Sequence, residues 1–197
     1  RIAPFFSLLP ITVVWVRTIA MRQHLFGAST GTIFLMSHTT FHRATGFGQF
    51  SLAPLVQQGV TEAGFSEPRP IQVQTIPAAL AGADILGLAQ TGTGKTAAFA
   101  LPIIERLVAK RRPGPCALIL APTRELAMQI HSDFEKLAKF TRLKVITVFG
   151  GVSERPQVRA LRDQPDIVVA CPGRLLDLMR QGKAMLAQIK ILVLDEA

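Results

Sequence analysis

Eight consecutive residues, Ala89 to Thr96, read Ala-Gln-Thr-Gly-Thr-Gly-Lys-Thr and have the types needed to bind phosphate. Gly92 and Gly94 let the backbone curl until several N–H groups point inward, and the N-terminus of a following helix adds partial positive charge. Lys95 is placed to reach the β- and γ-phosphates of a nucleotide, and the Thr96 hydroxyl is placed to ligate Mg²⁺. The general pattern G-x-x-x-x-G-K-[ST] has glycine in place of Ala89, a mild change because the position needs only a small residue. The stretch predicts a phosphate-binding loop, and the alternative is a tight strand-to-helix turn with an exposed lysine.

Two carboxylates, Asp195 and Glu196, follow the apolar run 191–194. A carboxylate at the end of a buried strand can hold Mg²⁺ directly or through water, and the next acidic residue can polarise the water that attacks a γ-phosphate. We therefore predict Asp195 as a metal ligand and Glu196 as the catalytic base. The alternative is a strand that reaches solvent in an acidic turn, which the phosphate-binding loop upstream disfavours.

These residues need a scaffold that brings strand ends together, and the hydrophobic pattern predicts one. Strands are expected at 84–88, 117–121, 145–149, 167–170 and 191–194. Helices are expected at 95–109, 125–140, 153–162 and 174–180, with two more at 52–63 and 72–81. The strands are continuous apolar runs, as a parallel sheet covered on both faces requires. The alternation predicts a three-layer α/β domain with a mainly parallel sheet, whose ligands bind at the carboxyl ends of the strands.

The charge balance indicates the class of partner. Among 197 residues, 22 Lys and Arg stand against 13 Asp and Glu, and this net charge of +9 favours nucleic acid, although an ordinary basic protein has the same balance. Cys116 and Cys171 are too few and too isolated for a disulfide framework or a zinc site, so we expect buried thiols in a reducing compartment, the cytoplasm. The N-terminal apolar run is interrupted by Pro4 and Pro10 and is shorter than the roughly 20 residues of a membrane helix, so no membrane partner is expected.

Residues 1–45 differ in composition from the rest of the chain. No Asp or Glu occurs before Glu62, and Gly, Ser and Thr mix with single apolar residues from Gly27 to Thr40. That pattern supports neither a helix nor a strand, so we expect an irregular extension that is disordered or not native to the mature protein. The folded domain is expected at 46–197 and to be incomplete at its C-terminus, because the sequence stops directly after an apolar strand.

Five motifs resemble those of the DEAD-box RNA helicases in order and spacing. They are Ala89–Thr96, Pro122–Ala127, Gly150–Gly151, Pro172–Arg174 and Asp195–Ala197. The resemblance covers Phe50 to Ala197, and the sequence looks most like the bacterial members of the family. In that family two RecA-like lobes close over ATP and RNA, so the resemblance implies that this chain is the N-terminal RecA-like lobe, truncated within its signature tetrapeptide. It also implies ATP and Mg²⁺ as cofactors and a second RecA-like lobe in the full-length protein, and it leaves the oligomeric state open.

The resemblance extends the nucleotide site upstream. The segment Gly64–Gln72 is similar to the family's adenine-reading motif, in which the Gln72 amide bonds to adenine, and Phe50 is expected to stack on the base. The family usually has Ser or Thr where this chain has Arg69, which puts in question a hydroxyl contact with the phosphate-binding loop. The residues expected to bind the nucleotide are Phe50, Gln72, Ala89, Gln90, Thr91, Gly92, Thr93, Gly94, Lys95 and Thr96.

Three motifs are expected to grip an RNA backbone. Each follows a predicted strand, and helix N-termini, glycines and arginines there suit phosphates without reading bases. Taken singly, each is also compatible with a capped helix or a plain turn. Cys171 stands where the family usually has Thr, which removes one hydroxyl, and the basic run 110–112 is expected to be a solvated loop. The residues expected to bind RNA are Pro122, Thr123, Arg124, Gly150, Gly151, Pro172, Gly173 and Arg174.

The predicted function is that of an ATP-dependent RNA helicase, with Lys95 and Glu196 as catalytic residues and Thr96 and Asp195 as metal ligands. The isolated fragment is expected to be nearly inactive, because the second lobe and its arginine are absent. One alternative is a DNA helicase or translocase with the same core, which usually lacks the motif of Phe50 and Gln72. Another is a non-hydrolysing fragment that only binds ATP and RNA.

Overall fold

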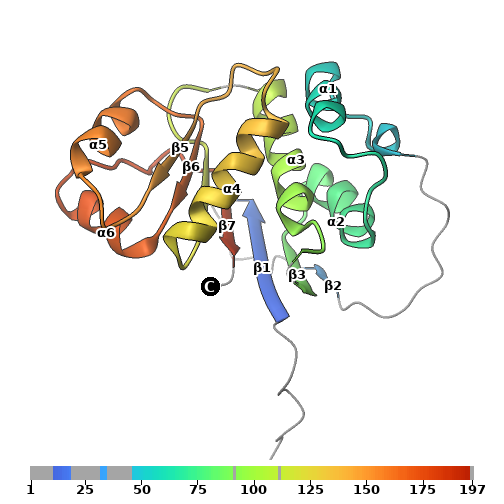
Figure 1. The fold of residues 1–197 in the computed structure, drawn as a ribbon, viewed down its shortest axis with the longest axis horizontal. Coiled ribbons are helices and arrows are strands. Elements are labelled where there is room, and N and C mark those ends of the chain that lie inside the picture. Colours follow the sequence, from blue (N-terminus) through green and yellow to red (C-terminus); the bar gives the residue numbers. More distant parts are fainter. Residues whose placement is uncertain (1–10, 19–31, 35–45, 91, 111, 196–197) are drawn as a thin grey trace, which may run out of the picture.

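A single seven-stranded sheet forms the centre of the molecule (Figure 1). The structure, a computed structural model, describes residues 11–18, 32–34, 46–90, 92–110 and 112–195, without the side chains of 11–18, 32–34 and 88–90. The strands lie in the order β2-β3-β1-β7-β4-β6-β5. Their bounds are β1 Ile11–Thr18, β2 Thr32–Phe34, β3 Ile85–Gln90, β4 Ala117–Leu120, β5 Val145–Val148, β6 Ile167–Ala170 and β7 Ile191–Asp195.

Helices alternate with these strands, as the hydrophobic pattern predicted. A short 3-10 helix, η1 Phe47–Phe50, comes before them. The α-helices are α1 Pro54–Glu62, α2 Pro70–Ala81, α3 Lys95–Ala109, α4 Arg124–Leu137, α5 Glu154–Arg162 and α6 Pro172–Arg180. Three of them, α1, α2 and α6, have proline in the first turn, where its missing N–H has no partner to lose.

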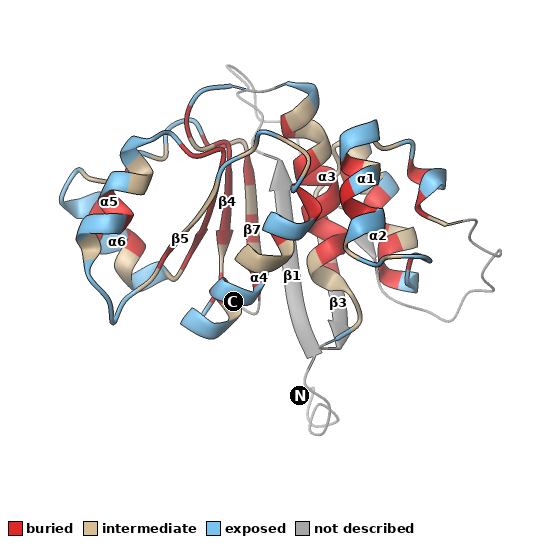
Figure 2. Ribbon diagram, turned by 45° about the horizontal axis from the view of Figure 1, so that its top comes forward, coloured by how far each residue is buried: buried red, intermediate tan, exposed pale blue. Residues whose placement is uncertain are grey.

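Alternate residues of β4, β6 and β7 pack into two separate cores, one on each face of the sheet. Ala117 and Ile119 of β4 lie in the core that α1, α2, α3 and α4 cover, whereas Leu118 lies in the core that α5 and α6 cover. Buried residues accordingly concentrate on the strands and on the inner faces of the helices (Figure 2). The predicted three-layer α/β domain is thus confirmed. Among the described residues, no helix has the length and hydrophobicity needed to cross a membrane.

The structure differs from the sequence-based expectation at two segments of residues 1–45. Ile11–Thr18 is a strand that pairs antiparallel with both β3 and β7, and Thr32–Phe34 is a strand parallel to β3. The run Thr-Val-Val-Trp-Val within β1 is rich in β-branched residues, which favour an extended chain. The rest of the predicted extension lies outside the described residues, and the domain boundary at residue 46 stays a prediction.

Candidate nucleotide site and nucleic-acid interface

The sequence motifs meet at one edge of the sheet. Strands β7, β4, β6 and β5 are mutually parallel, and β1 is antiparallel to both β3 and β7, so β3 runs in the same direction as the other four. The carboxyl ends of β3, β4, β5 and β6 lead directly into the segments that begin at residues 91, 121, 149 and 171. The phosphate-binding loop and the three predicted RNA motifs therefore share the edge where α/β sheets bind ligands.

The phosphate-binding loop connects β3 to α3, as predicted. Gly92 and Gly94 both have positive φ, 79° and 88°, and Gly94 is the N-cap of α3, which begins at Lys95. A Cβ on Gly94 would lie 2.6 Å from Nε2 of Gln72, so the position excludes side chains by conformation and by space. Thr91 lies outside the described residues.

Two residues at the start of α2 hold this loop from outside. Nε2 of Gln72 donates a hydrogen bond to the Gly94 carbonyl at 3.0 Å, and its Oε1 accepts one from the Arg69 backbone N–H at 2.8 Å. The Arg69 guanidinium donates to the Gly92 carbonyl. Gln72 is fully buried, whereas Arg69 is exposed. The Ser or Thr hydroxyl that the family usually has at this position is absent, and the Arg69 guanidinium makes a contact with the loop in its place.

The predicted stacking residue Phe50 lies in the hydrophobic core. It is 6% exposed, and its ring packs edge-on against Phe47, with 5.7 Å between the centroids. Phe47 also packs edge-on against Phe65, which precedes the segment leading to Arg69. The described contacts of Phe50 therefore belong to an aromatic cluster beneath this segment, and its stacking on a base stays a prediction.

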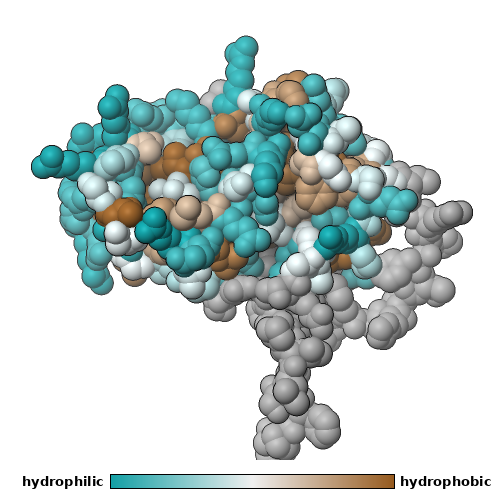
Figure 3. Space-filling view, in the orientation of Figure 1, coloured by the Kyte–Doolittle hydropathy of each residue, from teal (hydrophilic) through white to brown (hydrophobic). Residues whose placement is uncertain are grey.

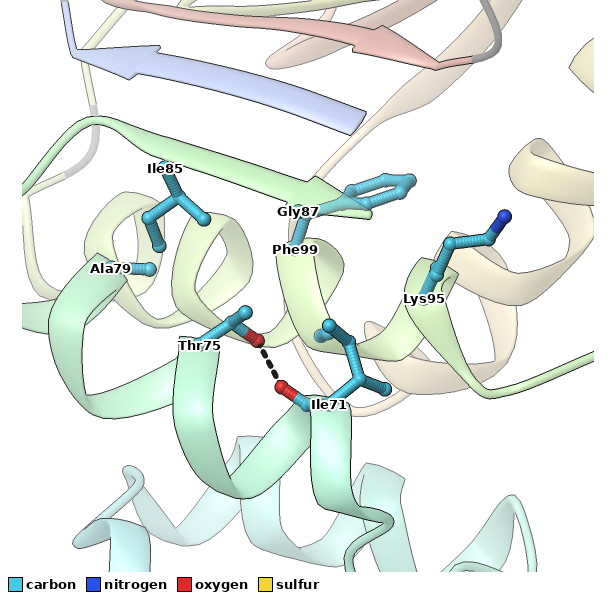
Figure 4. Close-up of a pocket in the computed structure, with 8 residues that line it drawn as sticks. Ile71, Thr75, Ala79, Ile85, Gly87, Lys95 and Phe99 are labelled. Carbon is cyan, nitrogen blue, oxygen red and sulfur yellow. Dashed lines mark hydrogen bonds between the residues drawn. The ribbon is translucent and has the colours of Figure 1, made fainter. Parts of the chain in front are cut away.

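Lys95 extends from the first turn of α3, and its amine points away from Ile85 and Ala79 (Figure 4). The residues around it enclose a cavity of about 20 Å³ between α2, α3 and β3. That volume is about what one water occupies, and the lining is almost entirely apolar. The cavity is therefore a packing feature and not a candidate for the nucleotide site.

The residues predicted to hold Mg²⁺ have the right chemistry for it. Thr96 offers a hydroxyl at the start of α3, and Asp195 is a buried carboxylate at the carboxyl end of β7, 4% exposed. Oxygen donors of these kinds are the ligands that Mg²⁺ prefers. The Asp133 carboxylate of α4 lies near the Thr96 hydroxyl; burial raises the pKa of this carboxylate, and the Lys136 charge and the Thr96 hydroxyl lower it in part. Glu196, the predicted base, lies outside the described residues.

The first predicted RNA motif forms a capped helix start. The Thr123 hydroxyl accepts a hydrogen bond from the Leu126 N–H at 3.2 Å, so Thr123 is the N-cap of α4. The next residue, Arg124, places its guanidinium over the ring of Phe149, 4.9 Å from the centroid. Because Phe149 immediately precedes Gly150, this cation–π contact joins the first motif to the second.

The second motif is an open glycine turn held from behind. The buried Gln157 of α5 accepts from the Phe149 N–H at 3.0 Å and donates to the carbonyls of Phe149 and Ser153, both at 3.1 Å. Gly151 has φ 77°, and a Cβ on Gly150 or Gly151 would meet no atom within 4 Å. The turn therefore has a fixed backbone and open space in front of it.

The third motif bonds to the far side of that turn. Nη1 of Arg174, on α6, donates to the Val152 carbonyl at 3.2 Å. The Gly150–Gly151 turn thus lies between Arg124 on one side and Arg174 on the other. Cys171 caps α6 without a side-chain hydrogen bond, as expected from the loss of the family's hydroxyl.

Sequence reasoning missed three residues of this arrangement. Phe149 and Gln157 fix the glycine turn, and Asp133 lies near the Thr96 hydroxyl. The hydrophobic periodicity around each of these residues is that of an ordinary strand or helix. Only Phe149, which directly precedes two glycines, could have been singled out from the sequence.

Comparison with known proteins agrees with this geometry. The sequence model of the DEAD/DEAH box helicase family matches residues 69–197, well over half of the chain. The chain is 48% identical over 161 residues to "DEAD-box ATP-dependent RNA helicase 28" of Oryza sativa, covering 80% of this chain and 20% of the relative. It is also 48% identical over 162 residues to "ATP-dependent RNA helicase drs1" of Schizosaccharomyces pombe, covering 81% and 21%. For "DEAD-box ATP-dependent RNA helicase RhpA" of Helicobacter pylori the identity is 46% over 157 residues, covering 80% and 31%.

The chain belongs to the DEAD/DEAH box helicase family. It spans about a fifth to a third of the length of these relatives. They include a plant, a fungus and a bacterium at similar identity, so the expected closeness to bacterial members is not confirmed.

Proposed function

We propose that this chain is the N-terminal lobe of an ATP-dependent RNA helicase, which binds ATP with Mg²⁺ at residues 89–96 and an RNA backbone along the neighbouring turns. One observation carries the proposal. A glycine-rich phosphate-binding loop and an open glycine turn flanked by two arginines lie at the same edge of one sheet. The names of the relatives, each an RNA helicase, support it further.

In this proposal each residue of the loop has one task. The backbone N–H groups of the loop and the Lys95 amine hold the phosphates, and Thr96 and Asp195 hold the metal. A Mg²⁺ ion held by these two residues would supply positive charge to offset the charge that develops on the phosphates. Asp133, beside Thr96, would accept a hydrogen bond from its hydroxyl and leave the oxygen lone pairs for the metal, and Glu196 would take a proton from the attacking water.

A second lobe belongs to the proposed longer protein. Efficient hydrolysis by such enzymes needs charge stabilisation by an arginine that no motif of this chain supplies. We therefore expect the 197-residue chain to bind nucleotide and hydrolyse it slowly, with duplex unwinding confined to a two-lobed protein.

Adenine reading by Gln72 requires a rearrangement. Its amide retains one N–H and one lone pair beyond the bonds to Arg69 and Gly94, but the side chain is fully buried. Adenine can reach the amide only when the Arg69 segment or the loop moves.

The proposal is tested by nucleotide titration. Gln72→Ala removes the hydrogen bond to the Gly94 carbonyl for both nucleotides, so the test is the difference between them: ATP affinity should fall by on the order of 1–3 kcal/mol more than GTP affinity, the range known for bidentate amide–adenine contacts. Gln74→Ala, two positions along the same helix, is the matched control and should change neither. Equal affinities for ATP and GTP in the unmodified chain contradict adenine reading. Tighter binding to DNA than to RNA of the same sequence favours the DNA-helicase alternative.

A further inference from the structure

Helix α5 presents three arginines on one face. Arg155, Arg159 and Arg162 are spaced four and three residues apart, which places them side by side along the helix, and all three are exposed. None of them forms a salt bridge with a described residue. Like charges at this spacing destabilise a helix by a few tenths of a kcal/mol per pair. We call these residues the arginine ridge; its charge has no counterpart within the described chain.

The ridge borders a groove that is itself cationic. The groove is lined by the three arginines together with Val158, Glu154 and Lys183, which follows α6. The Glu154 carboxylate is paired with the Lys183 amine at 2.6 Å. Arg162 and Lys183 also line the adjoining hollow formed with residues 181–188. Four cations thus face one carboxylate that is already paired, which favours an anionic occupant.

The ridge begins where the predicted RNA contacts end. Arg174 bonds to the Val152 carbonyl, and α5 starts two residues later at Glu154. The Lys183 hydrogen bond chiefly, and Arg174 more weakly, lower the pKa of Glu154, so both cations lie close to the first turn of α5. Hydrophilic side chains project from the end of the molecule that α5 and α6 form (Figure 3). Positive charge therefore continues from the glycine turn along α5.

We propose that the arginine ridge binds the phosphate backbone of an RNA strand beyond the Gly150–Gly151 turn, and so lengthens the RNA track of this lobe. This inference rests on the proposed function. Arg155 and Arg162 are seven residues apart, which at 1.5 Å per residue adds roughly 10 Å of track. Guanidinium groups suit phosphate oxygens because their planar fork donates two parallel hydrogen bonds.

The apolar side chains of α5 favour nucleic acid over a lipid surface. A helix that lies on a membrane inserts an apolar face between the headgroups. The apolar residues of α5, Val158 and Leu161, pack in the protein core with Val148 and Leu178 instead. The ridge therefore offers charge without an insertable face.

The test compares RNAs of two lengths. We expect Arg155→Gln/Arg159→Gln to weaken binding of a fluorescent RNA of about 16 nucleotides and to leave one of about 6 nucleotides unchanged, lengths that span known single-strand sites. Each lost contact removes about 0.7 from the salt slope. If the variant and the unmodified chain bind the long RNA equally at about 1 M salt, the variant with two lost contacts should bind it roughly tenfold more weakly at about 0.15 M salt. Adding Arg162→Gln should weaken the long RNA further. The control pair is Lys110→Gln/Arg142→Gln, two exposed cations in loops at the opposite edge of the sheet, and it should change neither RNA.

Each other outcome overturns the proposal. Equal weakening by the ridge pair and the control pair would mean that net charge alone acts. Equal weakening of short and long RNA would mean that the arginine ridge belongs to the RNA site at the Gly150–Gly151 turn and does not lengthen it. An effect confined to vesicles containing anionic lipid would identify a membrane surface. If Arg124→Ala and Arg174→Ala also fail to weaken the short RNA, the proposed function itself is at fault.

Discussion

The phosphate-binding loop and the glycine turn both expose backbone at the same edge of the sheet, but the protein holds them in different ways. The first is held from outside, because Gln72 and Arg69 of a neighbouring helix donate to its Gly94 and Gly92 carbonyls. The second is held from behind by Gln157, which bonds to both backbone groups of Phe149. Two arginines from other helices, Arg124 of α4 and Arg174 of α6, contact Phe149 and Val152 on either side of this turn.

The difference matches what each loop is proposed to bind. A nucleotide is a small ligand that needs a fixed cradle, so the Gln72 amide that holds the phosphate-binding loop is buried and Gly94 of the loop admits no side chain. A nucleic-acid backbone needs repeated charge and open access, so the glycine turn has nothing within 4 Å of its missing Cβ atoms. Single substitutions in the phosphate-binding loop should therefore cause large losses of ATP affinity. Substitutions around the glycine turn should lower RNA affinity by smaller and more similar amounts.

The largest expected effect is that of Gly94→Ala. The new Cβ would overlap the buried Gln72 amide in a backbone conformation that costs alanine about 1–3 kcal/mol. We expect the affinity for ATP to fall tenfold or more. The control is Gly48→Ala, where φ is not positive and nothing lies within 4 Å, and it should leave affinity unchanged. Unaltered ATP binding by Gly94→Ala in an equilibrium titration would contradict a rigid cradle.

Removing the Gln157 amide tests the second region. Gln157→Ala leaves the Phe149 N–H without its partner, at a cost of about 1–3 kcal/mol, or several degrees in melting temperature for a chain of this size. RNA affinity should fall as the turn loosens, while ATP affinity stays constant. Gln164→Ala, an exposed glutamine after the same helix, should change neither quantity. A change in ATP affinity alone would show that the two loops are not independently held.

Arg69 is expected to have a smaller effect, because its side chain is exposed. Arg69→Ala removes one hydrogen bond to the loop and should weaken ATP and ADP binding about threefold to tenfold, in line with roughly 1 kcal/mol for such a bond. Adenosine binding should not change, since it has no phosphate for the loop to hold. Arg69→Ser restores the family's hydroxyl and should recover part of the loss. A loss of adenosine affinity equal to that of ATP would place Arg69 at the base instead.

The core of the fold and the positions of the motifs could be predicted from the sequence because both depend on local patterns. Apolar runs defined the parallel strands, and the glycine, lysine and threonine types defined the loop. What holds the loops could not be predicted. Arg69 and Gly92 are in contact although they are 23 positions apart in the sequence. Gln157 stands among arginines in α5, so the sequence there has the composition of a surface helix and gives no sign that this glutamine is buried. The strand β1 could not be predicted because Pro4 and Pro10 interrupt the N-terminal apolar run, and because its partners β3 and β7 lie far along the sequence.

The most direct test of the central claim is the salt dependence of RNA binding by Arg124→Ala and Arg174→Ala. Both guanidinium groups lie beside the glycine turn, where we expect them to contact phosphates and no bases. Each substitution should lower affinity about equally for RNAs of different sequence and flatten the slope of log affinity against log salt by roughly 0.7. Arg112→Ala, at an exposed position in the loop before β4, should leave the slope unchanged. A slope that changes for Arg112→Ala and not for Arg124→Ala or Arg174→Ala would contradict the account, because the RNA would then lie at the opposite edge of the sheet.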